Sequence, residues 1–439
     1  MRSGLVVRKL SHASLDITGW GGSLVTDPWF IGRAFADAWS HSFEPAPDAW
    51  RTLECCRYIW ISHGHPDHFS PETLLRIPSE SRGKIEVLIA DTVPNRPLVG
   101  WFTRNDFAVL PLKSGREYEL EGELRATVGE VHFGDSWLHL SFADTSLLNI
   151  NDCVLRSHDI TKLQRRYKGV DLIAVQYGVA NWTGNLEDVD ERSAAAAAVL
   201  DRVRTMVRAL EPQRVLPFAS EFEFCHKENV HLNSEQNDIS DVTAVVNEFS
   251  VPVVQLTNGD EFDLTQSTVR RMHPPSPRKD HEAIQQRSVG VSELQRTQRA
   301  RLESTAGFHG KIRSWIYFRL IERTRLGRIV VATPDTAMVF ELTATSIKEV
   351  SNSVSPNIVM SSEMFAELIG KSYGLDNLFI GGRFIRKSQD ALLRLGVILG
   401  LDRLRTMGFH FGPSLVLRPG LLFTLLERLV SRRWTSVRQ

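Results

Sequence analysis

The chain has 439 residues, of which 42% are hydrophobic and 24% charged, and its 52 basic and 52 acidic side chains leave no formal net charge. This composition is typical of a soluble globular protein with more than one domain, and it gives no reason to expect binding to nucleic acid or to a membrane. The four cysteines include no Cys-x-x-Cys pair, and residues 1–17 lack an apolar stretch of signal-peptide length. We therefore expect a cytoplasmic protein.

The first 265 residues alternate short apolar runs with turns and helices. Residues 56–62, CRYIWIS, are predicted to form a buried strand, and a helix should follow because Ser70 can cap it and Pro71 suits its first position. A long helix is predicted from residue 190 to its stop at Pro212. Further strands are expected at residues 4–10, 13–20, 22–30, 84–90, 135–142, 145–151, 171–177, 214–220 and 251–257. Many strands with few helices predict two sheets covered by helices, an α/β layered sandwich.

The composition changes after residue 265. Residues 266–305 are polar, charged and proline-containing, which predicts a linker leading into a helix. Residues 306–439 have the pattern of a smaller α+β domain, whose role the sequence does not indicate. Residues 421–430, LLFTLLERLV, form an amphipathic segment that suits core packing or self-association, so a homodimer is one option.

The loop at residues 61–70, ISHGHPDHFS, places four metal-binding side chain types within six positions. His63 and His65 follow an extended segment, in which residues two apart point to the same side, so they can hold one ion together. Pro66 favours a turn that directs Asp67 and His68 elsewhere, where they can hold a second ion. The loop thus predicts part of the ligand shell of two metals.

Each shell needs about four ligands, so the others must come from distant strand ends. Asp152 ends an apolar strand and could bridge two cations about 3.5–4 Å apart. His132 is the preferred third histidine, with Glu130 as its rival, and His226 is the preferred last ligand, with His231 as its rival.

The segment HGHPDH at residues 63–68 resembles the H-x-H-x-D-H motif of the metallo-β-lactamase superfamily. Within it, DPWFIGRAFADAWS, VHFGDS, LLNINDC and PFASEFEFCH resemble the catalytic portion of CMP-N-acetylneuraminate hydroxylase, over roughly residues 20–260. The resemblance implies a metallo-β-lactamase-like αββα sandwich followed by the smaller α+β domain. It also implies one site made by His63, His65 and His132, and another made by Asp67, His68 and His226, with Asp152 between the two metals.

The ligand set contains nitrogen and oxygen only, which suits iron and zinc. The resemblance favours a two-iron oxygenase acting on a small polar molecule that is nucleotide-sugar-like or amino-acid-like. The alternative is a zinc hydrolase that cleaves an ester, amide or phosphodiester, with Asp67 orienting the attacking water. A metal-binding scaffold without catalysis is the third hypothesis.

The hydroxylase family carries a Rieske iron–sulfur domain, whereas this chain starts at the lactamase-like strands and has no Cys-x-His pair. We therefore expect no Rieske cluster in this chain. An oxygenase would then take electrons from a separate donor protein or from its substrate.

Several further side chains were weighed for roles around the metals. Tyr177 and Trp182, in a loop after a strand, are predicted to contact substrate, although ordinary loop packing is the alternative. His12 is predicted to support a ligand carboxylate rather than to bind metal, and Asp27 either supports a ligand or caps a turn. Arg33 and Lys227 could receive an anionic substrate group, but surface solvation explains them more simply.

Overall fold

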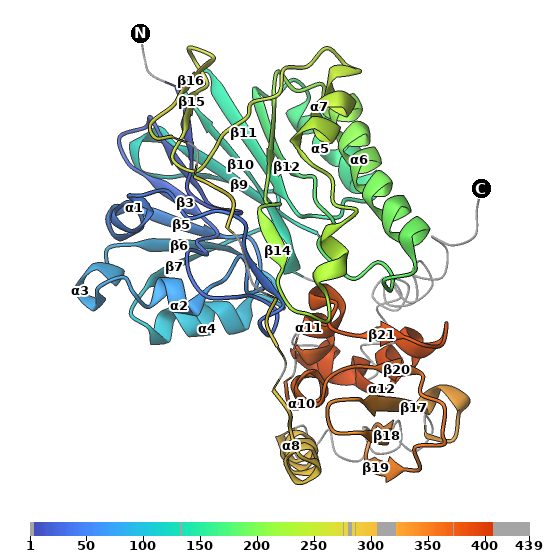
Figure 1. Ribbon diagram of the computed structural model, residues 1–439. Coiled ribbons are helices and arrows are strands. Elements are labelled where there is room, and N and C mark those ends of the chain that lie inside the picture. Colours follow the sequence, from blue (N-terminus) through green and yellow to red (C-terminus); the bar gives the residue numbers. More distant parts are fainter. Residues whose placement is uncertain are drawn as a thin grey trace.

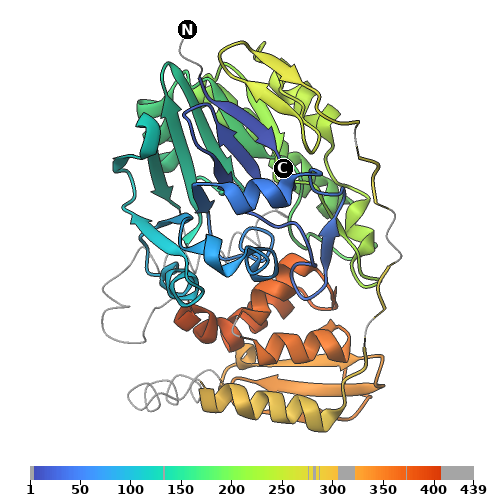
Figure 2. The same cartoon turned by 90° about the vertical axis from the view of Figure 1, so that its left-hand side faces the viewer.

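The computed structural model describes residues 4–131, 134–274, 276–279, 283–285, 287–304, 322–371 and 373–406. Two β-sheets lie face to face with helices on their outer sides (Figure 1). A smaller unit, called the late unit and made by residues 287–304, 322–371 and 373–406, packs against one end of them. The same arrangement is seen from the side in Figure 2. The predicted amphipathic segment at 421–430 lies outside the described residues.

The first sheet has eight strands and mixes antiparallel with parallel pairs. Its strands in spatial order are β16 (Thr268–Arg270), β15 (Glu261–Asp263), β1 (Val6–Lys9), β2 (Leu15–Thr18), β3 (Leu24–Thr26), β5 (Tyr58–Ile61), β6 (Glu86–Ala90) and β7 (Ala108–Leu112). β3, β5, β6 and β7 run parallel, and all four residues of β5 are buried. A strand covered on both faces reads as a continuous apolar run, as β5 does.

The second sheet has six strands. They are, in spatial order, β13 (Val215–Phe218), β12 (Leu172–Gln176), β11 (Thr145–Asn151), β10 (Ser136–Phe142), β9 (Arg125–Glu130) and β8 (Glu117–Glu119). β11, β12 and β13 are parallel, so their carboxyl ends meet at one edge. Loops at such an edge are where α/β proteins commonly place their functional side chains.

Three apolar layers hold the sandwich together. One lies between the sheets and contains Trp60 and Leu88 from the first sheet with Leu138 and Leu172 from the second. A second layer packs α1 (Ala49–Cys55), α2 (Pro71–Leu74) and α4 (Arg96–Arg104) on the first sheet. A third packs α5 (Ser157–Tyr167), α6 (Val189–Leu210) and α7 (Ile239–Asn247) on the second. The predicted αββα sandwich is therefore confirmed.

The late residues build a five-stranded sheet with helices beside it, as the predicted α+β pattern requires. Its strands are β19 (Ile347–Val350), β18 (Met338–Thr343), β17 (Arg328–Thr333), β20 (Ile358–Val359) and β21 (Ile385–Arg386), and its helices are α8 (Val291–Ser304), α10 (Ser362–Gly370), α11 (Gly374–Gly381) and α12 (Ala391–Thr406). The predicted boundaries at residues 265 and 305 stay predictions. No helix of the described residues is long and apolar enough to cross a membrane.

One buried apolar cluster is shared by the sandwich and this late unit. It joins Trp29, Phe35 and Trp39 of the early chain to Phe365 and Phe384 of the late unit. A backbone hydrogen bond also joins the two parts, since the amide of Trp182 donates to the carbonyl of Phe379 at 2.8 Å. The late unit is therefore packed on the loops that follow the strand ends, rather than linked loosely to the sandwich.

Asp16, in β2, gives the sandwich a predictable response to pH. Burial raises the pKa of its carboxyl from 3.8 to about 6, although a hydrogen bond from Ser23 and the charge of Arg8 act in the opposite direction. The folded protein thus keeps a proton that the unfolded chain releases above pH 3.8, so this stabilisation is lost as the pH rises through about 6. We expect Asp16→Asn to raise the unfolding free energy at pH 7.5 by on the order of 2 kcal/mol, and to do so far less at pH 4. Urea unfolding at both pH values measures this, and a less stable variant at pH 7.5 would show that Asp16 acts there as an ion-pair partner.

Candidate metal centre

The loop after β5 brings its polar side chains together by simple local geometry. The amides of His68 and Phe69 donate to the carbonyl of His65 at 3.0 and 2.7 Å, which closes a tight turn after Pro66. Ser70 then caps α2, because its hydroxyl accepts from the amide of Thr73 at 3.2 Å. The buried strand and the capped helix therefore hold both ends of the loop.

Three side chains form the first group that can hold a cation: His63, His68 and Asp152. His63 Nε2 and His68 Nε2 lie 3.6 and 3.7 Å from Asp152 Oδ2. His65 adjoins the group, since its Nδ1 is 2.7 Å from His63 Nε2. Asp152 follows β11 at a position where the pairing with β12 shifts register, and Asn151 there has a positive φ of 58°. This irregularity turns the Asp152 carboxylate towards the histidine loop.

A second group contains Asp67, His68 and His12. Asp67 Oδ2 lies 3.2 Å from His68 Nε2 and 3.5 Å from His12 Nε2. The imidazole of His12 is held edge-on by Trp29 and Phe222, with ring centroids 5.6 and 5.7 Å away. His68 belongs to both groups, so the two are adjacent, as a pair of neighbouring ions requires.

Asp27, which follows β3, orients the histidine loop from behind. Its carboxylate accepts hydrogen bonds from the amide and hydroxyl of Ser62 at 2.8 and 2.7 Å and from the side-chain amide of Asn151 at 2.7 Å. Its Oδ2 is also 3.0 Å from His68 Nδ1, so in a metal-loaded site His68 would keep its remaining proton on that nitrogen and offer Nε2 as the ligand. Of the two roles predicted for Asp27, the structure thus shows the supporting one.

The charges of the site depend on one another. Burial alone would raise the pKa of Asp67 and lower that of His68, but their mutual attraction reverses both shifts, so Asp67 is well below and His68 well above the usual value. Burial would likewise raise the pKa of Asp152, yet His63 and His68 lower it. Asp67 Oδ1 and Asp152 Oδ1 are buried without a hydrogen-bond partner in the part of the chain that the structure describes. Two unpartnered carboxylate oxygens beside imidazole nitrogens fit a site for hard or borderline cations.

The other predicted ligands lie elsewhere or are not described. His132 is outside the described residues, and the side chain of its rival Glu130 is at the exposed end of β9. His226 Nδ1 lies 3.5 Å from Glu228, with Arg383 nearby, and His231 Nε2 lies 3.3 Å from the carbonyl of Gly184. Within the described ranges, neither belongs to a group that can hold a metal, whereas His12 lies with Asp67 and His68. The roles of His132 and His226 as ligands stay predictions.

The predicted substrate residues are packed rather than open. Trp182 is buried and stacks on Phe384 with ring centroids 4.8 Å apart, and the guanidinium of Arg386 lies 5.0 Å from its ring. Tyr177 is buried in the layer under α6 and α7, and burial raises its pKa. Their roles in substrate binding stay predictions.

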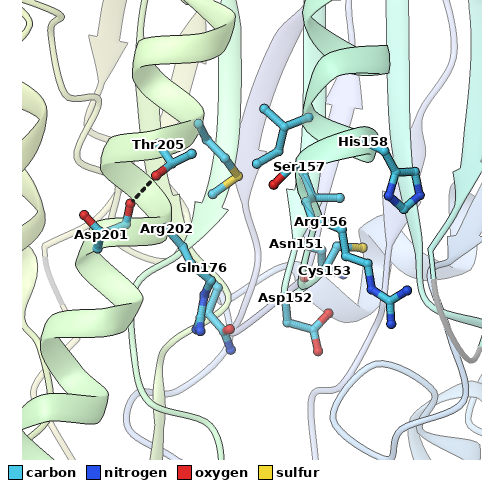
Figure 3. A pocket seen from close by; sticks show the side chains of 13 residues that line it. Asn151, Asp152, Cys153, Arg156, Ser157, His158, Gln176, Asp201, Arg202 and Thr205 are labelled. Atoms are coloured by element: carbon cyan, nitrogen blue, oxygen red, sulfur yellow. Dashed lines mark hydrogen bonds between the residues drawn. The ribbon is translucent and has the colours of Figure 1, made fainter. Parts of the chain in front are cut away.

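A pocket of about 620 Å³ opens beside Asp152, between α5 and α6 (Figure 3). Polar side chains from four elements line it: Asn151 and Asp152 at the end of β11, Arg156 and His158 at the start of α5, Gln176 at the end of β12, and Arg202 on α6. A molecule in this pocket could therefore reach the Asp152 carboxylate directly.

The loss of the Asp27 carboxylate should weaken metal binding without removing a ligand. We expect Asp27→Asn to reduce metal affinity about 10–100-fold, because the hydrogen bonds that fix His68 and Ser62 would lose their charged acceptor. Competition with a coloured chelator measures the affinity. Asp16→Asn is the matched control, as it replaces a buried aspartate on the neighbouring strand that does not touch the site. Equal affinities of the two variants would contradict this role.

Comparison with known proteins gives sequence relatives over part of the chain, while no family model matches. A protein named as a Rieske 2Fe-2S iron–sulfur protein of Mycobacterium tuberculosis is 25% identical over 311 residues, covering 63% of this chain and 57% of the relative. A protein of the same description from Mycolicibacterium smegmatis is 29% identical over 255 residues, covering 54% and 47%. The cytidine monophosphate-N-acetylneuraminic acid hydroxylase of Xenopus laevis is 30% identical over 153 residues, covering 34% and 25%. The chain thus spans about half of the mycobacterial relatives and less of the hydroxylase.

Solved structures that resemble part of this chain include a hydroxylase and hydrolases. CmlA, a diiron β-hydroxylase from Streptomyces venezuelae, is 17% identical with a TM-score of 0.38, covering 60% of this chain and 55% of that one. An isothiocyanate hydrolase from Delia radicum gut bacteria is 12% identical with a TM-score of 0.42, covering 58% and 98%. The metallo-β-lactamase fold protein YhfI from Bacillus subtilis is 9% identical with a TM-score of 0.40, covering 59% and 99%.

The facing sheets, their helical covers and the HGHPDH loop at the strand ends define a protein of the metallo-β-lactamase fold with side chains suited to bind metal. Its relatives in sequence are Rieske-type iron–sulfur proteins and CMP-N-acetylneuraminic acid hydroxylases.

Proposed function

We propose that this chain is a dinuclear metal enzyme, and that it is an iron-dependent oxygenase that hydroxylates or oxidises a small polar substrate. The observation that carries the proposal is the pair of adjacent ligand groups that share His68 and contain two unpartnered carboxylate oxygens. A purely structural cluster would leave no reason for such oxygens to be buried without donors.

The residues divide between the two ions by their positions. His63, His65 and Asp152 would hold one ion, and Asp67, His68 and His12 the other, with Asp152 near both because its Oδ2 faces His63 and His68 alike. His132, as predicted from the sequence, stays a candidate for the first ion. Asp27 would keep His68 in the tautomer that binds metal.

The chemistry depends on which metal these residues take. Two irons would supply activation of dioxygen, whereas two zincs would supply a water that ionises near pH 7 instead of about 15.7. The protein groups would bind and orient the substrate in the pocket next to Asp152, and the buried walls around His12, His63 and His68 would limit the access of bulk water.

The oxygenase is preferred because the relatives in sequence carry the names of a hydroxylase and of iron–sulfur proteins. Electrons would then come from a separate donor protein or from the substrate. The alternative, a zinc-dependent hydrolase of an ester, amide or phosphodiester, uses the same ligands, so the metal decides between the two.

Elemental analysis of protein purified without added metal, together with oxygen uptake under a chemical reductant, tests the proposal. We expect about two irons per chain, visible absorbance and reductant-dependent oxygen uptake. Two zincs without uptake would replace the oxygenase by the hydrolase. A chain that contains no metal and does not take up iron or zinc would overturn both.

A further inference from the structure

We infer that the pocket beside Asp152 binds a substrate with an anionic group, a carboxylate or a phosphate, and that Arg202 on α6 is the residue that holds this group. This inference rests on the proposed function, since it assigns the substrate class of the same site. It differs from the sequence-based candidates Arg33 and Lys227, because neither of those lines this pocket.

Arg202 is a cation that no other described residue engages. Its neighbour Asp201 lies 3.2 Å from Arg204 instead, on the same helix. No hydrogen bond or ion pair engages the Arg202 guanidinium within the described part of the chain. Arg202 is an exposed residue at the pocket, and the atoms around its guanidinium lower its pKa by desolvation, with no carboxylate acting against that effect. Such a group is stabilised when an anion enters and completes its hydrogen bonds.

The surroundings of Arg202 favour an anion at that point. Gln176, at the end of β12, lies on the same side of the pocket, and its side-chain amide is not engaged by any described residue (Figure 3). The first turn of α5, with Arg156 and His158, lines the pocket as well, and the start of an eleven-residue helix carries partial positive charge. The planar guanidinium and the amide together offer donors matched to a carboxylate or a phosphate.

The volume of the pocket and its lining residues suit a substrate that has an anionic group at one end and the reacting group at the other. Asp152 lines the same pocket as Arg202, and its Oδ2 lies within 3.7 Å of both His63 Nε2 and His68 Nε2. A volume of about 620 Å³ accommodates a molecule of the size of a small metabolite. An anionic group at Arg202 would thus direct the rest of the substrate to the metals, and this contact would select anionic over neutral molecules.

Calorimetric titration with inorganic phosphate and with succinate, on metal-free and on metal-loaded protein at low ionic strength, tests the inference. We expect both anions to bind the wild type, and Arg202→Gln to weaken binding at least about tenfold in both forms, because a charge-assisted contact is lost. Arg202→Lys should retain part of the affinity. Arg208→Gln is the matched control on the same helix, since its guanidinium lies over the Phe249 ring, 5.7 Å away, and not in the pocket.

The outcomes separate the inference from the proposed function. Binding that Arg202→Gln leaves unchanged, or the absence of binding of either anion by the wild type up to about 10 mM, overturns the role of Arg202. Anion binding that depends on Arg202 in a protein that takes up no metal would uphold the inference and overturn the dinuclear enzyme. A preference for one anion over the other in the wild type identifies the substrate group as a carboxylate or a phosphate.

Discussion

Replacing Asp152 with alanine should abolish activity and reduce the affinity for metal by more than about 100-fold, beyond the range expected for a supporting residue. The carboxylate faces both His63 and His68 through one oxygen, and no described residue engages the other, so it is placed to contribute to the binding of both ions. Its removal should not unfold the protein, because Asp152 follows the end of β11 and one of its carboxylate oxygens has no partner among the described residues. Elemental analysis after gel filtration and thermal unfolding of the metal-free protein measure the two effects.

Asp201→Ala is the matched control for this substitution. Asp201 also lines the pocket, but it is exposed and lies beside Arg204, so its removal should leave the metal content unchanged. A variant Asp152→Ala that retains two ions with wild-type affinity would show that the ions are held elsewhere.

Replacing Arg383 with alanine should destabilise the protein by about 3–5 kcal/mol, the range found when one partner of a buried ion pair is removed. The Arg383 side chain is 2% exposed and donates to Glu228 at 2.8 Å, to Glu363 at 2.9 Å and to the carbonyl of Ala36 at 2.7 Å. Without it, the half-buried carboxylates of Glu228 and Glu363 and the carbonyl of Ala36 would lose their charged donor. Urea unfolding gives the change in free energy.

Arg386→Ala provides the comparison, since this side chain is 23% exposed and pairs with Glu191 at 3.0 Å. Its loss should cost about 1–2 kcal/mol, because the ion pair contributes at most about 1 kcal/mol and the contact with the Trp182 ring about 0.5–1 kcal/mol. Equal effects of the two substitutions would mean that the Arg383 pairs are screened by solvent.

Arg383 should also affect the metal centre. The carbonyl that it binds belongs to a segment in which Phe35, Ala36 and Asp37 all have positive φ, a conformation that residues other than glycine adopt at a cost. The Phe35 ring lies 5.7 Å from the His65 ring. Loss of Arg383 should therefore let this segment relax and lower the metal affinity together with the stability.

The sequence predicts the part of the site whose geometry depends on neighbouring residues in the chain. His63, His65, Asp67 and His68 share one turn between a buried strand and a capped helix, and both elements are visible in the residue pattern. Asp152 could be predicted because it ends an apolar strand, and strand ends of parallel sheets converge.

His12 was expected to lie beside a ligand carboxylate, but the sequence did not indicate that this carboxylate is Asp67. It lies between β1 and β2, more than fifty residues before Asp67, and it faces that carboxylate only because the strands of the first sheet pair in the observed order. The local sequence KLSHASLDI contains no indication of this pairing. Its residue type and its place at a strand end were the only available signals.

The contacts of Trp182 with the late unit could not be predicted from the sequence either. A tryptophan in a loop after a strand suggested substrate contact, but the structure stacks it on Phe384 and places Arg386 over its ring. These partners are about two hundred residues away in the chain, so only the packing of the two parts reveals them. The way in which residues 322–406 cover the strand-end loops was therefore beyond the reach of sequence patterns.

The shared cluster of Trp29, Phe35, Trp39, Phe365 and Phe384 has a consequence for the history of this protein. When two surfaces bury such large side chains against each other, a substitution on one surface requires a matching substitution on the other, because a poor fit would expose aromatic rings or leave voids. Recombination that brought in the sandwich from one ancestor and the late unit from another would have met this barrier. We therefore expect the two halves to have been inherited as one piece, with compensating substitutions concentrated in these aromatic positions.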